Sequence, residues 1–369
     1  MLVDQLTEIF STYKEKNIIE VLKQHDSIIL FGPVSETESI RTLMEKNALK
    51  ISAFCDTNSA NWGSSIEDIP IISHSDLLKC DLLHTALCIV GVRKDYLIGH
   101  LKDLGIKKYF ILIDDGRFLP LLEKYAEFHL DHCDEIRETY HLLSDDASRN
   151  TFLDLLRFKL TSNFPHSLWD QSVKCYFHPI VGIRINDRIF DGGARIGDTA
   201  LKFAEHLNNQ CKIFSFEPEK RNYEMMEKNI KEYHLQEVVQ SFHVGLWAYS
   251  GELRLKVSHD AKYSGCHQIS EQGDEMVKVI SLDDFVRERK VVPDLIKLDV
   301  ECAEMQVLLG AQETILTYRP RLIISLYHKT EDLWEIPLFI NSLKLGYNFY
   351  LVQHDPAMTE TVLYAIASN

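Results

Sequence analysis

Three carboxylates and a histidine in the last third of the chain have types and spacing that could support chemistry. Asp299 follows the apolar run Leu295–Leu298. Glu301 comes two residues later, and Glu304 lies about one helical turn beyond Glu301. Acidic groups this close are unfavourable unless a cation, a sulfonium or hydroxyl donors meet them. They predict a site that binds a substrate hydroxyl, holds a base with a raised pKa, or ligates a hard divalent ion such as Mg²⁺. The alternative is a helix N-terminus that favours acids, which would account for Glu304.

His328 follows a second apolar run, and histidine is suited to proton removal near neutral pH. A hydrogen-bonded histidine at a sheet edge is the alternative interpretation. Tyr327 and Trp334 could shape a sugar-binding mouth, because aromatic rings pack against the apolar faces of sugars, although Trp334 could equally belong to the core. Lys297 lies on the same strand face as Asp299, so we expect these two side chains to pair.

The segment Asp191–Gly197 combines an acid with three glycines, and Glu217 follows about 20 residues later. Glycines in a strand-to-helix turn let a ligand approach the backbone closely. An acid at the tip of the next strand can accept hydrogen bonds from both ribose hydroxyls. The spacing predicts a nucleoside-containing cofactor without deciding which one, because Gly192, Ala194 and Gly197 also imitate a dinucleotide fingerprint. A plain strand-to-helix turn is the alternative.

The elements that must position these residues alternate between strand and helix. In the C-terminal half we expect strands at 188–193, 211–216, 238–244, 252–257, 276–280, 294–299, 320–326, 348–353 and 360–366. The last two are separated by a short loop containing Asp-Pro, which predicts a hairpin that closes a parallel sheet. Such a hairpin is typical of class I methyltransferases and not of dinucleotide dehydrogenases.

The N-terminal part has the same alternation over about 115 residues. An amphipathic helix is expected within 1–24 and a second helix at 38–46, and strands are expected at 27–32, 50–55, 69–72, 86–90 and 109–113. This pattern predicts a small parallel sheet of Rossmann type. Residues 116–165 have helical periodicity, with a helix start near 144–148. We therefore expect an α/β protein with a Rossmann-like accessory domain (1–115), a helical linker or cap (116–187) and a catalytic domain (188–369).

Composition excludes several classes of protein. The chain has 369 residues, 45% of them hydrophobic, and a formal net charge of −15, which argues against a general nucleic-acid or anionic-membrane binder. The eight cysteines include no Cys-x-x-Cys pair and several lie in apolar runs, so free buried thiols are expected instead of disulfides or a zinc site. The start of the chain does not resemble a signal peptide, and no run approaches ~18 apolar residues. We expect a cytoplasmic protein without a membrane span.

A series of short segments occurs in a fixed order over more than 200 residues. These segments are Asp191–Gly197, Phe216–Pro218, Ser281–Phe285, Pro293–Glu304, Arg319–Pro320, Ile324–His328 and Asp332–Pro337. Together they resemble the FkbM family of S-adenosylmethionine (SAM)-dependent methyltransferases. The resemblance implies a class I methyltransferase fold, with SAM held at the first strand and its turn.

The resemblance also implies roles for individual residues. The cofactor contacts expected from it are Asp191, Gly193, Ala194, Gly197, Glu217 and Pro218. On the acceptor side we expect Glu301, Glu304, Tyr327 and Trp334. Arg195 and Cys302 depart from the family pattern, since relatives often carry an aromatic or small residue at the first position and usually glycine at the second. A cation at position 195 is unfavourable beside a sulfonium, and a side chain at position 302 could narrow the pocket.

The predicted reaction is a single displacement that methylates a hydroxyl of a sugar, a glycan precursor or a polyketide-like metabolite. His328 is the expected base and Asp299 the expected orienting group, because methyl transfer from SAM needs mainly in-line positioning and proton removal. Two alternatives stay open at this point. One is an NAD-dependent oxidoreductase, and the other is a non-catalytic nucleotide-sugar-binding protein with a vestigial SAM site. Mg²⁺ dependence, the acceptor and the oligomeric state are open as well.

The first 115 residues resemble the N-terminal domain that accompanies some bacterial sugar acetyltransferases and methyltransferases. The matching segments are Phe31–Gly32, Phe54–Asn58, Trp62–Gly63 and Ile69–Ser73. The resemblance implies a nucleotide-sugar site. However, Gly32 is followed by Pro33 and not by a glycine-rich phosphate turn, and Glu36 would repel a phosphate. A docking or structural domain is the alternative.

Overall fold

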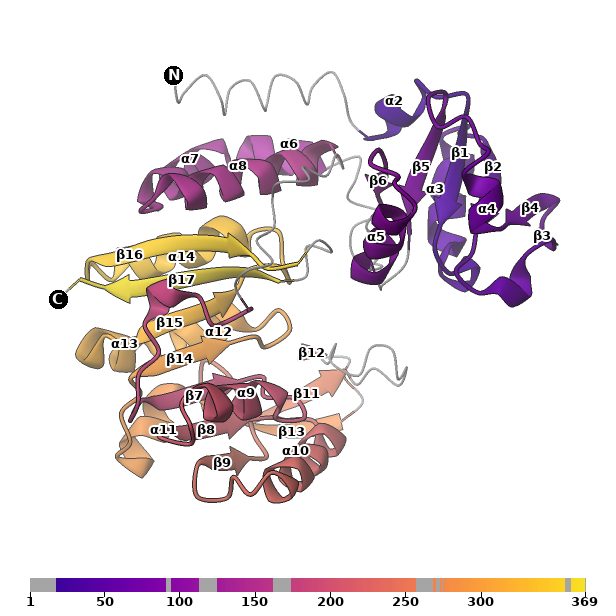
Figure 1. Cartoon of the computed structure of the whole chain (residues 1–369). Helices are drawn as coiled ribbons and strands as arrows, with labels where there is room; N and C mark the ends of the chain where they lie inside the picture. Colours follow the sequence, from indigo (N-terminus) through magenta and orange to yellow (C-terminus); the bar gives the residue numbers. More distant parts are fainter. Residues whose placement is uncertain are drawn as a thin grey trace. The chain divides into compact units, whose positions relative to one another are not determined.

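We analysed a computed structural model of the chain (Figure 1). The residues that it describes are 18–90, 94–112, 125–161, 174–256, 268–269, 273, 275–355 and 360–368. Two compact units emerge from the packing. The N-terminal unit comprises Met1–Tyr140, Arg149–Asp170 and Asp355–Met358, and the C-terminal unit comprises His141–Ser148, Gln171–His354 and Thr359–Asn369. The domain boundaries expected after residues 115 and 187 stay predictions.

The N-terminal unit contains a six-stranded sheet of order β3-β4-β2-β1-β5-β6. Its strands are β1 (Ser27–Phe31), β2 (Ile51–Cys55), β3 (Ser65–Ile66), β4 (Ile69–Ile72), β5 (Thr85–Ile89) and β6 (Phe110–Ile111). All neighbouring pairs are parallel except β3 with β4. The sequence pattern predicted this parallel sheet, but β6 is shorter than expected.

Short helices connect these strands. They are α2 (Ile18–Leu22), α3 (Glu38–Lys46), α4 (His74–Leu77) and α5 (Lys94–Asp103), with 3₁₀ turns at Val34–Glu36 and Ser59–Asn61. Helix α3 has the bounds that the sequence predicted. Of the helix expected within 1–24, only the part from residue 18 lies among the described residues. Strand side chains such as Leu30, Phe54 and Cys88 form a common buried core with α2 and α3.

The helical block expected within 116–165 contains three helices in its described part. These are α6 (Tyr125–Asp131), α7 (Cys133–Leu142) and α8 (Asp146–Thr161). The helix start expected near 144–148 is present, because the Asp145 carboxylate accepts a hydrogen bond from the Ser148 amide at the beginning of α8. The rest of the predicted linker, 162–173, lies outside the described residues.

The C-terminal unit contains a seven-stranded sheet of order β16-β17-β15-β14-β7-β8-β9. Its strands are β7 (Arg188–Gly192), β8 (Lys212–Phe216), β9 (Val239–Phe242), β14 (Leu295–Leu298), β15 (Arg321–Ser325), β16 (Tyr347–Gln353) and β17 (Thr361–Ala367). The first five in this list run parallel to one another, whereas β17 runs antiparallel to both β15 and β16. The predicted closing hairpin is therefore confirmed.

Alternating side chains on these strands bury both faces of the sheet. On one face, Ile189 and Ile213 share a core with side chains of α9 (Asp198–His206) and α10 (Lys220–Glu232). On the other face, Phe190 and Phe214 make edge-to-face contacts with Phe285 of α11 (Leu282–Arg289). The remaining helices are α12 (Glu304–Leu309), α13 (Gln312–Tyr318) and α14 (Asp332–Ser342), with a 3₁₀ turn at Pro179–Val181.

Four of the C-terminal strands form a separate sheet, which the sequence pattern did not indicate. Its order is β10-β13-β11-β12, with β10 (Gly245–Leu246), β11 (Gly251–Lys256), β12 (Gln268–Ile269) and β13 (Glu275–Ile280). Periodicity shows that a segment is extended but not which strands it pairs with. The single run expected at 238–244 thus ends in the main sheet at Phe242, and the next strand, β10, begins a different one.

No helix among the described residues is long and apolar enough to cross a membrane. The seven cysteines that the structure describes are free, and Cys55, Cys88 and Cys211 are buried.

Candidate active site

The glycine turn after β7 is held against the end of β14. Gly193 has φ 72°, and a Cβ built on it would lie 1.7 Å from the carbonyl oxygen of Asp299. Glycine is therefore required here both by the left-handed backbone and by the close approach of the two chain segments. The amides of Gly193 and Ala194 donate to the carbonyl of Phe216, which ties the turn to β8 as well.

Glu217 follows β8 and faces the same turn. Its carboxylate accepts hydrogen bonds from the amides of Arg195 (2.8 Å) and Glu219 (2.9 Å). Burial raises the pKa of Glu217 to about 7 despite these two donors. Arg195 contributes its backbone in a left-handed conformation (φ 50°), while its side chain is exposed. Position 195 thus contributes a backbone amide to Glu217, a role that does not depend on the arginine side chain.

These residues line an open pocket of about 680 Å³ in the C-terminal unit. The lining residues are Gly193, Arg195, Phe216, Glu217, Pro218, Asn222, Gly245, Leu246, Leu255, Asp299, Val300, Glu301 and Ala303. The pocket places the predicted cofactor residues Gly193, Glu217 and Pro218 together with the predicted acceptor residues Asp299 and Glu301.

Asp191 lies beneath the pocket and not in its wall. It is fully buried, and Lys297 Nζ is 3.0 Å from its carboxylate. Lys297 also donates to the carbonyls of Gly192 (3.1 Å) and Gly193 (3.0 Å), and Asp191 and Asp299 together raise the pKa of its ammonium against the effect of burial. The expected pairing of Lys297 with Asp299 is wrong, because the register of β7 and β14 sets Lys297 directly beside Asp191.

Two more residues expected to contact the cofactor are packed behind the turn. Ala194 is buried, and Gly197 precedes α9, where a Cβ would lie 2.9 Å from the Met226 side chain. Neither lines the pocket. Their small size instead allows the turn and α9 to pack against α10.

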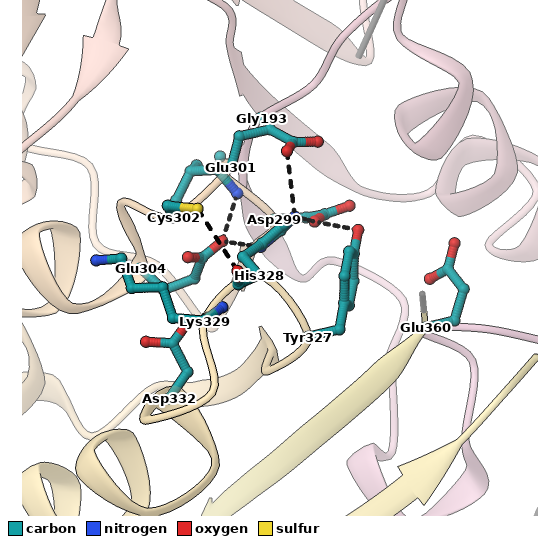
Figure 2. A network of polar contacts seen from close by, with 12 residues as sticks. Gly193, Asp299, Glu301, Cys302, Glu304, Tyr327, His328, Lys329, Asp332 and Glu360 are labelled. Carbon is teal, nitrogen blue, oxygen red and sulfur yellow. Dashed lines mark hydrogen bonds and ion pairs between the residues drawn. The ribbon is translucent and has the colours of Figure 1, made fainter. Parts of the chain in front are cut away.

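Two tyrosines fix the carboxylate of Asp299. Tyr327 donates to Oδ1 at 2.8 Å (Figure 2), and Tyr176 donates to Oδ2, also at 2.8 Å. Burial by itself would raise the pKa of Asp299, but Lys297, His328 and the two hydroxyls lower it below its ordinary value. Asp299 is therefore an ionised acceptor with a fixed orientation, and it is too weak a base to take a proton readily.

His328 is buried among three carboxylates (Figure 2). Its Nδ1 lies 2.8 Å from Oε1 of Glu304, and its Nε2 lies 3.4 Å from Asp299 and 3.6 Å from Glu301. Burial disfavours the charged imidazolium, but these neighbours, Glu304 first, raise the pKa of His328 well above its ordinary value. A raised pKa disfavours proton removal by His328, because an imidazolium has no lone pair to accept a proton, and the role of base stays a prediction.

Glu301 and Glu304 differ in environment. Glu304 is fully buried and accepts a hydrogen bond from the Val300 amide (2.8 Å), as expected for an acid in the first turn of α12. Glu301 is partly exposed, lines the pocket and has φ 50°. Cys302 follows with φ 75°, and its Sγ lies 3.7 Å from the carbonyl of His328. The thiol thus faces backbone and is not among the residues that line the pocket.

Trp334 does not reach the pocket. It lies in α14 with 1% of its surface exposed, as the core alternative predicted. Tyr327 is connected to the pocket only through Asp299.

Sequence reasoning missed Tyr176 and the apolar wall of the pocket. Tyr176 lies in an irregular segment before Pro179–Val181, where no periodicity or motif distinguished it. Leu246 and Leu255 belong to the second sheet, so only the tertiary structure could place them at the cofactor turn. The spacing of Asn222 from Glu217 was the one usable signal, because the first turn of the next helix faces the strand end.

Comparison with known proteins supports the assignment of this region. Residues 191–349 match the family model described as "Methyltransferase FkbM domain". The hexuronic acid methyltransferase AglP of Haloferax volcanii is 26% identical over 162 residues, which is 44% of this chain and 64%, less than two thirds, of that protein. The crystal structure of methyltransferase FkbM from Methylobacillus flagellatus KT is similar in fold, with TM-score 0.70, 18% identity and 99% of each chain covered. The region that carries the pocket is therefore similar to methyltransferase domains of the FkbM type.

Proposed function

We propose that the protein is a SAM-dependent O-methyltransferase that acts on a hydroxyl of a sugar or glycan precursor. The observation that carries this proposal is that Glu217, Gly193, Asp299 and Glu301 line the same pocket. In this proposal Glu217 accepts hydrogen bonds from the two ribose hydroxyls, and Asp299 and Glu301 accept one from the acceptor hydroxyl. The contact of Gly193 with the Asp299 carbonyl fixes the distance between these two halves.

The proposed reaction is an in-line displacement. A lone pair of the acceptor hydroxyl oxygen forms a bond to the methyl carbon, the bond from that carbon to the sulfonium sulfur breaks, and its electron pair stays on sulfur. The products are a methyl ether and S-adenosylhomocysteine, and the hydroxyl proton passes to a base. We assign that base to Glu301, because it lines the pocket and is partly exposed, whereas His328 is buried and does not line it.

The sugar acceptor rests on the similarity to the hexuronic acid methyltransferase and on the hydrogen-bonding character of the pocket. Carboxylates accept hydrogen bonds from sugar hydroxyls, and Asp299 is already oriented for this by Tyr176 and Tyr327. Trp334 is omitted from the proposed acceptor site because it is buried in α14.

The test measures cofactor binding and transfer separately. Calorimetry should give micromolar or tighter binding of S-adenosylhomocysteine, at least tenfold weaker binding for Glu217→Ala, and no binding of NADH. Methyl-labelled SAM with a panel of sugars and nucleotide-sugars should then label an acceptor, and Glu301→Gln should lower turnover with little change in cofactor affinity. Stabilisation by NADH but not by S-adenosylhomocysteine would refute the proposal in favour of an oxidoreductase. Cofactor binding without labelling of any acceptor would favour the non-catalytic alternative.

We propose an accessory role for the N-terminal unit. Its sheet has the Rossmann-like parallel order, but β1 is followed by Gly32, Pro33 and a 3₁₀ turn instead of a glycine-rich phosphate turn. The nucleotide-sugar site implied by resemblance is tested by titrating the full chain with a nucleotide-sugar in the presence of saturating S-adenosylhomocysteine.

A further inference from the structure

The environment of His328 suits a metal ion better than a second proton. We propose that Nε2 of His328 and Oδ1 of Asp299 bind a divalent first-row metal ion such as Mn²⁺, with Glu304 as the carboxylate that orients the imidazole (Figure 2). Donor atoms of Asp299, Glu304 and His328 all lie within 4.8 Å of one another. The proposal deepens the proposed function and rests on it for the ion's role, since the ion would lie on the acceptor side of the pocket.

Both proposed ligands have the supporting partners that metal ligands need. Nδ1 of His328 lies at hydrogen-bond distance (2.8 Å) from the buried carboxylate of Glu304. A carboxylate on one imidazole nitrogen fixes the ring and makes the other nitrogen a better ligand. Asp299 is fixed in the same way by the hydroxyls of Tyr176 and Tyr327, and each of its oxygens keeps a lone pair for a cation.

Two carboxylates face the other ring nitrogen of His328, because Nε2 lies 3.4 Å from Asp299 and 3.6 Å from Glu301. Two ligands at right angles, each about 2.1 Å from one cation, are about 3 Å apart. The side chains of His328 and Asp299 therefore need to move only slightly for Nε2 and Oδ1 to bind one ion. Glu301 stays beside the ion as the proposed acceptor of the hydroxyl proton.

The charges in this network also favour a divalent cation. Three carboxylates lie within 3.6 Å of the ring nitrogens of His328, and a single positive charge on the imidazole would leave them in excess. Lys297, which lies near Asp299, is committed to Asp191 at 3.0 Å. Oε2 of the fully buried Glu304 has no hydrogen-bond partner within the described part of the chain. A divalent ion would add positive charge where the buried carboxylates lack it.

The ligand set indicates which ion and which acceptor fit. Imidazole is an unusual ligand for Mg²⁺, whereas Mn²⁺ accepts both carboxylate and imidazole, so the histidine favours a first-row metal over the Mg²⁺ expected from the carboxylates alone. Only two protein ligands are assigned, so positions remain for two oxygens of the acceptor. An acceptor with two adjacent hydroxyls could occupy both, which places the methylated hydroxyl beside Glu301. The proposed acceptor class is therefore a sugar with a vicinal diol.

The experiment measures metal binding directly in the full chain. Protein stripped with EDTA and then dialysed is titrated with Mn²⁺ alone, and free Mn²⁺ is followed by its EPR signal. One bound ion per chain is expected, with binding about tenfold or more weaker in His328→Gln and Asp299→Asn. Glu304→Gln should weaken binding by a smaller factor, since it orients a ligand, as changes in such partners weaken metal sites by about 10–100-fold. Glu335→Gln is the matched control, because Glu335 is an exposed carboxylate of α14 and should leave binding unchanged.

Two results would overturn the metal site. One is no stoichiometric binding in the unchanged protein, and the other is equal binding in His328→Gln, Asp299→Asn and Glu335→Gln. Circular dichroism and S-adenosylhomocysteine affinity are measured on each variant, so that loss of fold is not mistaken for loss of a ligand. Failure here is distinct from failure of the proposed function. If the protein binds cofactor and transfers the methyl group in EDTA but does not bind Mn²⁺, the metal site is wrong and the methyltransferase proposal stands. If it binds Mn²⁺ but not the cofactor, the metal site stands and the methyltransferase proposal is wrong.

Discussion

The proposed role of Glu217, to accept hydrogen bonds from two ribose hydroxyls, requires an ionised carboxylate, yet its surroundings favour the neutral acid. It is 5% exposed, and burial raises the pKa of its carboxyl from an ordinary 4.5 to about 7. A raised pKa in the folded state means that this group stabilises the unliganded protein at low pH, and that this contribution is lost between about pH 4.5 and pH 7. Hydroxyls of a bound ribose would stabilise the ionised form and so reverse the effect.

We therefore expect the affinity for S-adenosylhomocysteine to fall by up to about tenfold per pH unit below pH 7. Binding at pH 6 should release a proton from Glu217, which calorimetry in buffers of different ionisation enthalpy measures. Asp332 is a control, because burial and Glu304 raise its pKa to about 7 as well, yet it does not line the pocket. Asp332→Asn should keep the pH dependence and Glu217→Gln should abolish it. An affinity that is flat between pH 6 and pH 8 would contradict the assignment.

The pair of Lys297 and Asp191 is the second prediction at this scale. Both side chains are almost fully buried, so removing one leaves an unpaired charge, which typically destabilises a protein by about 3–5 kcal/mol. Lys297→Met should lower the unfolding free energy of the C-terminal unit by about this amount. Lys297→Met combined with Asp191→Leu should recover part of the loss, because no unpaired charge remains. Denaturant unfolding of both variants measures this, and losses that simply add would show that the two residues are not coupled.

At the scale of elements, the close approach of the β7 turn to β14 decides whether a site exists at all. Parallel strands end at the same sheet edge, so residues that follow β7, β8, β14 and β15 meet there. The approach is close enough that only the glycine at 193 fits against the Asp299 carbonyl. The cofactor half and the acceptor half of the pocket are therefore coupled through one backbone contact.

Gly193→Ala should reduce cofactor affinity at least tenfold and destabilise the C-terminal unit. Gly105→Ala is the matched control, since Gly105 has almost the same φ (73° against 72°) but a Cβ there would meet nothing within 4 Å. The free energy of unfolding of the control should fall only by the cost of an alanine in the left-handed conformation, about 1–2 kcal/mol. Thermal unfolding and calorimetry compare the two variants. Equal losses of stability, with cofactor affinity intact in Gly193→Ala, would show that the steric argument is wrong.

At the scale of the whole molecule, each of the two units has its own sheet and its own core. All residues proposed to contact the cofactor or acceptor belong to the C-terminal unit. A ligand that binds only the folded form of one unit stabilises that unit by mass action, about 2.7 kcal/mol at 100 times its Kd.

We expect S-adenosylhomocysteine to slow amide hydrogen exchange at 192–197, 216–219 and 299–303, and to leave β1, β2 and β5 unchanged. Hydrogen exchange with mass spectrometry measures this in the full chain, with and without ligand. Protection of the N-terminal strands alone would locate the cofactor in the other sheet and would be incompatible with the proposed pocket.

The sequence by itself determined the two alternating α/β regions, the closing hairpin and the members of the site that follow strands directly. Glu217, Asp299 and Glu301 were identifiable because strand ends in parallel sheets meet at one edge, so their positions follow from period and spacing alone. The glycine turn was identifiable for the same reason, since its residue types require an unusual backbone.

Only the tertiary structure decided which side chains pair and which are ionised. Lys297 meets Asp191 and not Asp299 because strand register, which no local pattern encodes, sets them side by side. Tyr176 reaches Asp299 from 123 residues away, and β10 and β11 bring apolar walls from a second sheet. The pKa of His328 depends on three carboxylates that only the folded chain brings together, so no local pattern in the sequence could indicate that it is raised.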